Sequence, residues 1–507
     1  MRSGRARATL LNERTALLVI LLGAAVARTW RLDLAEVGFD EAAVASLVMT
    51  WKLDGLLPLT GIVSSIGLPN PPAWPYVLAP ALLVFGTPQA LVFEGVAVGL
   101  ATVALTWWVA RRWLGPWGAL AAAAFYAGSF WSLVLGRGGW QPVFLQPVVL
   151  LCLDALLGLA LFRRPWLLVV ASGWLGLMVQ LHYIAVSYVV LIPVAAWLAR
   201  SVIRPVHIAT ALVALVLTLV PFAIYELHPS IALRDVALLV QQGGTGAQVD
   251  LDAWNLLWSV AGNGGAAGMV GIRGAGDLFG RWVLFGLLGD VLLAGGLIVL
   301  LRMPAGRFIL AWLFVPVVFL TRHALGVLPH YLWIELPAMS LAVAALAEWV
   351  RPRAVVIRGA FVAALVVYVG ASLATLATVL EFVDHSGERI GHGIPLRFSL
   401  AAATAARAAA APGREVLVGG PALETPVLRF ALGFETPSRS FDDCAAPPVE
   451  PSAIYLLTRQ QSPAAEALMA AGAPVLARVE RGLDAFLVLG QPSATPKIEP
   501  DPALCSR

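Results

Sequence analysis

Long runs of apolar residues, separated by short polar connections, dominate this chain. About eleven of these runs approach or reach the roughly 20 residues that an α-helix needs to cross the hydrocarbon core of a bilayer. The pattern predicts a polytopic α-helical membrane protein with about 11 transmembrane helices. The predicted spans are about 15–32, 89–110, 115–135, 142–162, 166–181, 183–199, 206–226, 282–301, 307–321, 328–350 and 355–381.

One further apolar run, 74–87, is too short to span a bilayer and follows Asn70-Pro71-Pro72. Counting it as a span would place Arg111-Arg112 and Arg163-Arg164 on the outer side, which argues against a span. We predict that this run forms a helix that lies in the membrane interface.

Arginine distinguishes the two sides of the membrane. With the N-terminus inside, the short inner connections hold pairs such as Arg111-Arg112 and Arg163-Arg164, whereas the longer outer segments hold fewer basic residues. The positive-inside rule then favours a cytoplasmic N-terminus and, with an odd number of spans, an outer C-terminus. Two outer loops are long, at about 33–88 and 227–281. We expect the second, which is rich in glycine, to lack secondary structure and to act as a lid or mobile segment.

The pattern changes after about residue 385. Residues 396–411 and 463–471 have helical patterns, and strand-like runs occur at 415–418, 453–458, 475–479 and 485–489. This alternation predicts a small extracytoplasmic α/β domain over 385–490, after a transmembrane module over 1–384, with a disordered tail at 491–507. Cys444 and Cys505 fall on the predicted outer side, where they could form a disulfide or remain free thiols.

Composition excludes several classes of protein. The chain is 59% hydrophobic and 13% charged, whereas soluble domains contain about 25% charged residues. Its net charge of +4 is small and no dense Lys/Arg tract with interleaved aromatic residues occurs, which argues against a nucleic-acid-binding protein. Three cysteines without a CxxC pair give no sequence signature for zinc or redox chemistry.

The unusual polar residues lie at one predicted depth, near the outer face. An ionisable group is costly to desolvate in a bilayer, so such a set indicates a functional cavity that opens outward. Other roles stay open: Arg137 and Arg322 as interface anchors, His182 as a packing residue and Glu41 as a helix-start carboxylate. The candidate residues are Asp40, Glu41, Arg137, Gln141, His182, Arg322, His323, His330 and Tyr331.

These residue types suit a particular chemistry. Carboxylates can act as general bases or metal ligands, and arginine and histidine can bind a phosphate. An acid and a phosphate-binding group at a membrane surface suit transfer of a group from a lipid-linked phosphate donor.

The chain resembles the GT-C superfamily of membrane glycosyltransferases, which use polyprenyl-phosphate sugars. The resemblance covers about 15–385 and is closest to the protein O-mannosyltransferases and the bacterial lipid A aminoarabinose transferases. It depends on four segments: Phe39-Asp40-Glu41-Ala42, Asn70-Pro71-Pro72-Ala73-Trp74-Pro75-Tyr76, Gly136-Arg137, and His330-Tyr331-Leu332 with Pro337.

The resemblance implies an inverting transfer of a sugar on the outer face of a bacterial cytoplasmic membrane. Asp40 would be the general base, or a metal ligand in those members that use a divalent metal, and outer arginine and histidine residues would hold the carrier phosphate. The acceptor would be a lipid, a glycan or a protein.

The chain also departs from the family pattern. Many relatives carry a second acid a few residues after the arginine at position 137, whereas this chain has Gln141. A metal site with two carboxylates is therefore in doubt, and the sequence assigns no certain cofactor.

Two other classes of function compete with a glycosyltransferase. A transporter or flippase of lipid-linked sugars predicts repeated halves and broken helices with charges at the midplane, and the sequence shows no such repeat. A non-enzymatic envelope assembly protein does not require an acid beside the bilayer.

Overall fold

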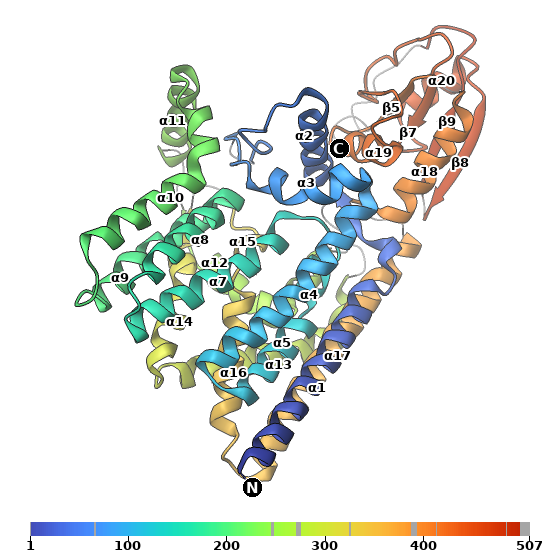
Figure 1. The fold of residues 1–507 in the computed structure, drawn as a ribbon. Helices are drawn as coiled ribbons and strands as arrows, with labels where there is room; N and C mark the ends of the chain where they lie inside the picture. The colour runs from blue at the N-terminus through green and yellow to red at the C-terminus, as the bar shows by residue number, and fades with distance from the viewer. Residues whose placement is uncertain are drawn as a thin grey trace.

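Helices form most of the chain, and a five-stranded sheet lies toward its C-terminus (Figure 1). This computed structural model describes residues 2–64, 67–244, 248–269, 275–323, 326–386, 393–411, 413–482 and 484–496. Four helices are long and apolar enough to cross a membrane: Pro88–Trp113, Gln141–Phe162, Pro205–Glu226 and Val355–His385. Six shorter apolar helices accompany them in the described residues. The membrane class is therefore confirmed, while the number of eleven spans stays a prediction.

Each predicted span coincides with a helix or with a pair of short helices. The continuous helices are α1 (Arg2–Thr29), α4 (Pro88–Trp113), α7 (Gln141–Phe162), α8 (Leu167–Leu181), α10 (Pro205–Glu226), α13 (Ala275–Leu300), α14 (Pro304–Leu320) and α17 (Val355–Ser386).

Three of the predicted spans are interrupted. The span predicted at 115–135 divides into α5 (Pro116–Gly128) and α6 (Phe130–Leu135), because Ser129 has an extended backbone. The span at 183–199 consists of the 3-10 helix η2 (Tyr183–Val190) and α9 (Leu191–Leu198). The span at 328–350 consists of α15 (His330–Trp333) and α16 (Leu336–Val350). These interruptions place helix ends, with their unpaired backbone groups, beside the candidate residues.

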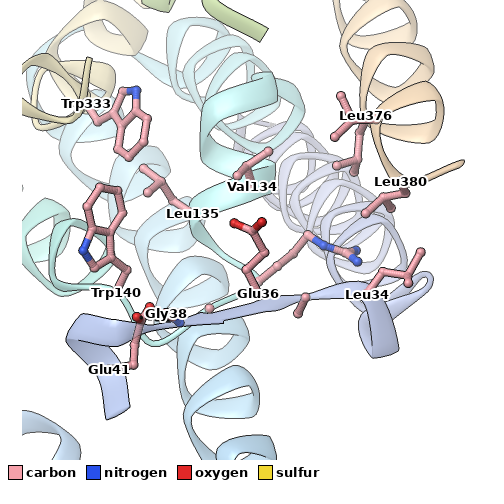
Figure 2. A pocket seen from close by; sticks show the side chains of 14 residues that line it. Leu34, Glu36, Gly38, Glu41, Val134, Leu135, Trp140, Trp333, Leu376 and Leu380 are labelled. Carbon is pink, nitrogen blue, oxygen red and sulfur yellow. Dashed lines mark hydrogen bonds between the residues drawn. The ribbon is translucent and has the colours of Figure 1, made fainter. Parts of the chain in front are cut away.

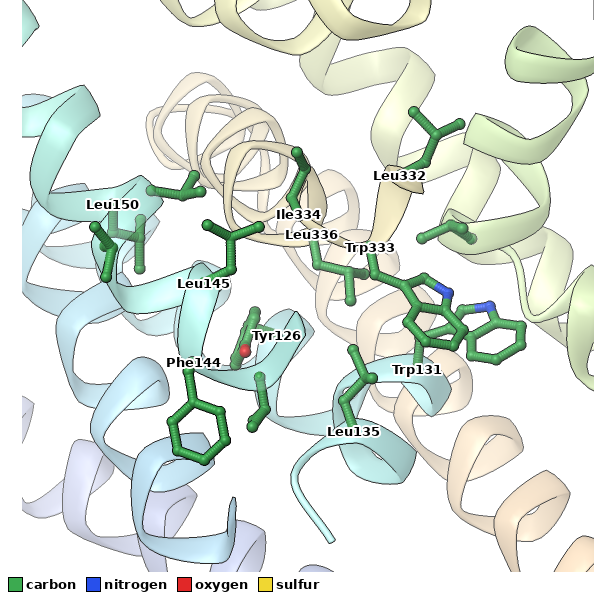
Figure 3. Packing of buried hydrophobic residues seen from close by; sticks show 14 of the residues in the cluster. Tyr126, Trp131, Leu135, Phe144, Leu145, Leu150, Leu332, Trp333, Ile334 and Leu336 are labelled. Carbon is green, nitrogen blue, oxygen red and sulfur yellow. The ribbon is translucent and has the colours of Figure 1, made fainter. Parts of the chain in front are cut away.

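Buried apolar residues of α5, α6, α7 and α16 pack together in the helical core, and Trp131 and Trp333 belong to the same buried cluster (Figure 3). Burial differs greatly between helices: 89% of the most apolar 18-residue stretch of α7 is buried inside the protein, but only 6% of the corresponding stretch of α10. A fully apolar helix that the protein leaves uncovered is stable in contact with lipid. The exposed surface of α10 therefore supports a membrane location.

The first outer loop contains more structure than its sequence predicts. It holds η1 (Leu32–Leu34), the strand β1 (Glu36–Gly38), the unpredicted helix α2 (Phe39–Asp54) and α3 (Ala73–Phe85), the helix predicted at 74–87. The helix α2 ends at Gly55, whose φ of 71° suits glycine. One face of α3 is buried through Trp74 and Leu78, while Phe85 is exposed.

The prediction that the second outer loop lacks secondary structure is wrong. Its described residues form α11 (Pro229–Gly244), β2 (Gln248–Val249), α12 (Asp252–Ala261) and the 3-10 helix η3 (Gly264–Met269). Apolar residues at helical spacing, such as Leu257 and Val260 on the buried face of α12, stabilise these helices despite the many glycines. The strand β2 pairs with β3 (Arg322–His323), which follows α14.

The C-terminal sheet has the strand order β6-β5-β7-β9-β8. The strands β6, β5 and β7 are parallel, whereas β9 is antiparallel to β7 and to β8. The elements are α18 (Leu396–Ala409), β5 (Val416–Gly419), α19 (Thr425–Leu432), β6 (Ser438–Phe441), β7 (Ile454–Leu457), α20 (Pro463–Ala470), β8 (Val475–Arg481) and β9 (Asp484–Leu489).

The sequence predicts four of these five strands. It misses β6, whose residues Ser438-Arg439-Ser440-Phe441 are mostly polar. Cys444 is disulfide-bonded, while Cys505 lies outside the described residues. Of the predicted tail, 491–496 form neither helix nor strand and 497–507 lie outside the described residues.

A short strand joins this C-terminal part to the first outer loop. The strand β4 (Gly393–Pro395) pairs antiparallel with β1, so residues about 355 positions apart in the sequence lie side by side. Figure 1 shows the sheet at the same end of the molecule as α2 and α3, opposite the N-terminus.

Candidate active site

Asp40 lies in the first turn of α2, and the sequence around it explains why the helix begins there. Gly38 is the N-cap residue, and the carboxylate of Glu41, three residues later, accepts a hydrogen bond from the Gly38 N–H at 3.0 Å. This arrangement is one half of a capping box: Glu41 satisfies a backbone donor at the helix start, while Gly38 has no side chain to bond back. The positive end of the helix dipole also favours the negative charge of a partly exposed Asp40.

Trp140 contacts Asp40 from another part of the chain. Its indole Nε1 donates a hydrogen bond to Asp40 Oδ2 at 3.4 Å. The backbone before Trp140 is firmly placed, because Trp74 Nε1 donates to the Gly139 carbonyl at 3.1 Å. A Cβ atom on Gly95 would lie 1.9 Å from the Gly138 carbonyl oxygen, so α4 and this segment are in direct backbone contact. Close packing therefore fixes the position of Trp140.

A row of aromatic and imidazole rings extends from Trp140. The ring centroid of His330 lies 5.1 Å from that of Trp140 and 4.4 Å from that of Tyr331. His182 lies 6.0 Å from His330 and 5.8 Å from Tyr331. We call Asp40, Trp140, His330, Tyr331 and His182 the Asp40 row. All five residues are partly exposed, so the row can contact a ligand.

His182 is the C-cap residue of α8 and contributes a neutral imidazole. Burial lowers its pKa to about 4, so it carries no charge at pH 7. Its Nδ1 accepts a hydrogen bond from the Ile184 N–H at 3.2 Å. The proton of the neutral ring is therefore on Nε2, which can donate to a ligand but does not supply the positive charge expected of an anion-binding group.

A cavity of about 80 Å³ lies beside this row. Figure 2 shows Glu36 reaching into it from β1, between Val134 and Leu135 on one side and Leu380 on the other. Glu41 and Trp140 line one end of it. Burial, and to a smaller degree the neighbouring charge of Asp40, raises the pKa of Glu41 to about 7. Glu41 thus combines a capping role with a carboxyl group that titrates near neutral pH.

Arg137 also lines the cavity, but its guanidinium is bound to the end of α1. Its Nη atoms donate to the carbonyls of Arg28 at 3.1 Å, Trp30 at 2.6 Å and Arg31 at 2.6 Å. The last carbonyls of a helix have no partner within the helix, and the Arg31 carbonyl just beyond the end also accepts from the Leu34 N–H at 3.0 Å. The side chain is only 4% exposed. The observed contacts support a helix-capping role, which the sequence did not predict.

Arg322, His323 and Gln141 are not members of the Asp40 row. Arg322 is exposed on β3, and His323 Nε2 lies 2.9 Å from Asp250 Oδ2 on the second outer loop. Gln141 follows Trp140 and begins α7; its Nε2 is buried and has no hydrogen-bond partner among the described residues. Asp40, His182, His330 and Tyr331 therefore belong to the Asp40 row, and Arg322 and His323 form a second group on β3, beside the second outer loop.

Two sets of side chains in the described residues have the spacing of metal ligands. In the first, single ligand atoms of Asp250, Asp252 and His323 all lie within 4.8 Å of one another, a donor set that suits divalent transition metals. The second set includes Cys444, whose disulfide removes the thiolate that would bind a metal. Asp40 belongs to neither set.

Sequence reasoning missed Trp140 and Glu36. Trp140 adjoins the Gly136-Arg137 segment that carries the resemblance, and the Gly138-Gly139 pair before it signals close backbone packing. Glu36 has the sequence signature of an ordinary loop charge, and only the pairing of β1 with β4 places it in the cavity wall.

Solved structures that resemble nearly the whole chain include two states of one protein. The crystal structure of ArnT from Cupriavidus metallidurans bound to undecaprenyl phosphate superposes with a TM-score of 0.58 at 14% sequence identity, over 97% of this chain and 100% of that chain. Its apo state gives a TM-score of 0.55 at 16% identity, with the same coverage. The chain therefore has the same fold as ArnT. The predicted fold resemblance is therefore confirmed.

A weaker likeness, with a TM-score of 0.49 at 12% identity, relates 84% of this chain to 64% of an Archaeoglobus fulgidus oligosaccharyltransferase. No protein-family profile matches the chain, and a search of curated proteins gave no significant match.

Proposed function

We propose that the chain transfers a sugar from a polyprenyl-phosphate donor to an acceptor on the outer face of a bacterial cytoplasmic membrane, with inversion at the anomeric carbon. The observation that carries the proposal is the Asp40 row, in which Trp140 links a partly exposed carboxylate to a line of rings that includes two histidines, in a chain with the fold of ArnT. The ArnT structure with undecaprenyl phosphate supports a lipid-phosphate carrier as the leaving group.

Asp40 acts as the general base in this proposal. Its carboxylate accepts the proton of the acceptor hydroxyl or amine. At the same time the acceptor oxygen or nitrogen attacks the anomeric carbon from the face opposite the phosphate. The bond between the anomeric carbon and the phosphate oxygen breaks, and its electrons stay on the departing polyprenyl phosphate. A positioned base of this kind typically contributes about 10²–10⁴-fold to the rate.

The leaving phosphate gains negative charge in the transition state and needs hydrogen-bond donors. We assign this role to His330 and Tyr331, with Nε2–H of His182 as a third donor, because these groups share the row with Asp40. Arg137 is the weaker candidate, since its Nη atoms already bind the carbonyls at the end of α1. Arg322 is exposed on β3 and is not a member of the row.

A divalent metal does not enter this mechanism. Asp250, Asp252 and His323 would hold such an ion, and it would supply positive charge on the second outer loop.

The proposal is tested with the full chain purified in detergent. A lipid extract that contains undecaprenyl-phosphate-linked sugars is incubated with a cell-envelope fraction as the acceptor source, and the products are followed by mass spectrometry. We expect a sugar-sized mass increase on an envelope component, with equal release of undecaprenyl phosphate and an inverted anomeric configuration by NMR.

The same preparation separates an enzyme from a transporter. If sealed vesicles that contain the chain move the lipid-linked sugar across the bilayer while no acceptor gains mass, the glycosyltransferase proposal is wrong.

A further inference from the structure

The backbone that leads into Asp40 is one strand of a two-stranded sheet. In this sheet Glu36 pairs with Pro395, Val37 with Ile394 and Gly38 with Gly393. The Leu396 N–H extends the pairing by donating to the Ala35 carbonyl at 2.8 Å. Gly38 is also the N-cap residue of α2, and Asp40 follows two residues later. The backbone that leads to Asp40 is therefore paired with β4 up to two residues before Asp40.

Gly393 is in unusually close contact with this backbone. A Cβ atom at Gly393 would lie 2.4 Å from the Val37 carbonyl oxygen, 2.6 Å from its carbonyl carbon and 2.8 Å from the Gly38 nitrogen. Real Cβ atoms essentially never approach other atoms closer than 3.0 Å. All three neighbours are backbone atoms, so no side chain can rotate to make room. Any larger residue at 393 must displace β4, β1 or both.

Ion pairs also connect the segments that flank the β1–β4 pair. Asp384, near the end of α17, forms ion pairs with Arg31 and with Arg397. Arg397 is also 3.6 Å from Asp33, in η1. Exposed ion pairs usually contribute little stability, but this network joins the segments on both sides of the β1–β4 pair. It therefore restrains the direction from which β4 approaches β1.

We propose that β4 is a positioning element for the catalytic base and that Gly393 is its critical residue. This inference rests on the proposed function of Asp40. A general base must lie within about 2.6–3.2 Å of the proton that it removes, and a displacement of about 1 Å can lower a rate about 10²-fold. Because β1 ends at the N-cap of α2, a shift of β1 moves the start of the helix and the Asp40 carboxylate with it.

Gly393→Ala and Gly393→Val test the proposal, with Gly370→Ala as the matched control. Gly370 lies in α17, where a Cβ atom would meet nothing within 4 Å. Transfer is measured with the undecaprenyl-phosphate sugar extract at varied concentrations, and hydrogen exchange is followed over residues 36–43. We expect a fall in kcat of about 10-fold for alanine and up to about 100-fold for valine, with the apparent KM for the donor changed less than about twofold. Exchange over 36–43 should rise in both variants and stay unchanged in Gly370→Ala.

Arg397→Gln provides a second route that places no bulk between the strands. It loosens the ion-pair network, so it should raise exchange over residues 36–43 and lower kcat by about 2- to 5-fold, again with KM preserved. Faster exchange over 36–43 with an unchanged kcat in the Gly393 variants would overturn the positioning role and leave the role of Asp40 intact. A fully active Asp40→Asn variant would instead overturn the base assignment, and the inference with it.

Discussion

The two groups of polar residues at the predicted outer face differ in what holds them. The Asp40 row is built from α2, the start of α7, the end of α8 and α15, and a backbone contact with α4 fixes its centre. The Asp250–His323 pair depends on two strands of two residues each. Both groups combine a carboxylate with a histidine. The difference teaches that packing, more than residue type, identifies the group suited to catalysis, since catalytic geometry must be held within fractions of an ångström.

Replacing the histidine of each group should show the largest contrast. His330→Ala removes a donor from the Asp40 row and should lower transfer by about 100-fold, the scale of losing one transition-state donor. His323→Ala removes the equivalent residue of the other group and should change transfer by less than about threefold. Steady-state rates with the same donor extract measure both. If His330→Ala and His323→Ala lowered the transfer rate equally, the two groups would not differ in their contribution to catalysis.

Trp140→Phe tests whether the indole hydrogen bond orients the Asp40 carboxylate for catalysis. The variant keeps an aromatic ring against His330 but removes the N–H that donates to Asp40 Oδ2. We expect kcat to fall about 10-fold with little change in KM, because only orientation of the base is lost. Trp117→Phe is the control, since Trp117 is partly exposed at the start of α5. If Trp140→Phe mainly raises KM, the indole binds substrate and does not position the base.

Glu41 should behave as a cap. Glutamine can replace glutamate in a capping box, so Glu41→Gln should keep transfer within about threefold of wild type, whereas Glu41→Ala should destabilise the protein by about 1 kcal/mol.

The pH dependence of stability has a defined sign. Burial raises the pKa of Glu41 in the folded state to about 7 from its ordinary 4.5, so its protonated form is favoured by folding. This contribution is fully present below about pH 4.5 and is lost as the pH rises through about 7. Thermal unfolding from pH 5 to pH 8.5 should therefore show a larger fall in Tm for wild type than for Glu41→Gln. Parallel curves would mean that Glu41 is already ionised in the folded protein at pH 5.

Removing divalent metals should have the smallest effect. Treatment with EDTA should lower transfer by less than about twofold. In the described residues, neither set of side chains with the spacing of metal ligands includes a residue of the Asp40 row. A loss above tenfold that Mn²⁺ restores in wild type, but not in Asp252→Asn, would bring the second group into the reaction.

Hydropathy was sufficient to predict the membrane class and the helices of the eleven apolar runs, because burial in lipid requires long apolar segments, and the alternation of apolar residues predicted four of the five C-terminal strands. The resemblance to the lipid A aminoarabinose transferases correctly indicated the fold, which is that of ArnT. The strand β6 was missed because its side chains are mostly polar, and α2 was missed because its start depends on a glycine cap and not on an apolar run.

The candidate site was predicted less well than the fold. Position along the chain brought Asp40, His182, His330 and Tyr331 to one depth, and the structure places them in one row. The same reasoning could not separate Arg322 and His323 from that row, since only the pairing of β2 with β3 directs them to another loop. Nor could it foresee that the guanidinium of Arg137 binds the end of α1.

The most direct test of the account compares the two ends of α2. Asp40→Asn changes the carboxylate in the first turn, and Asp54→Asn changes an exposed carboxylate at the last residue of the same helix. Both variants should insert into the membrane and unfold at the wild-type temperature within about 2 °C, as surface substitutions usually do. We expect Asp40→Asn to lose at least about 100-fold in transfer, as loss of a general base requires, and Asp54→Asn to stay within about twofold. Wild-type transfer by a correctly folded Asp40→Asn variant would contradict the central claim.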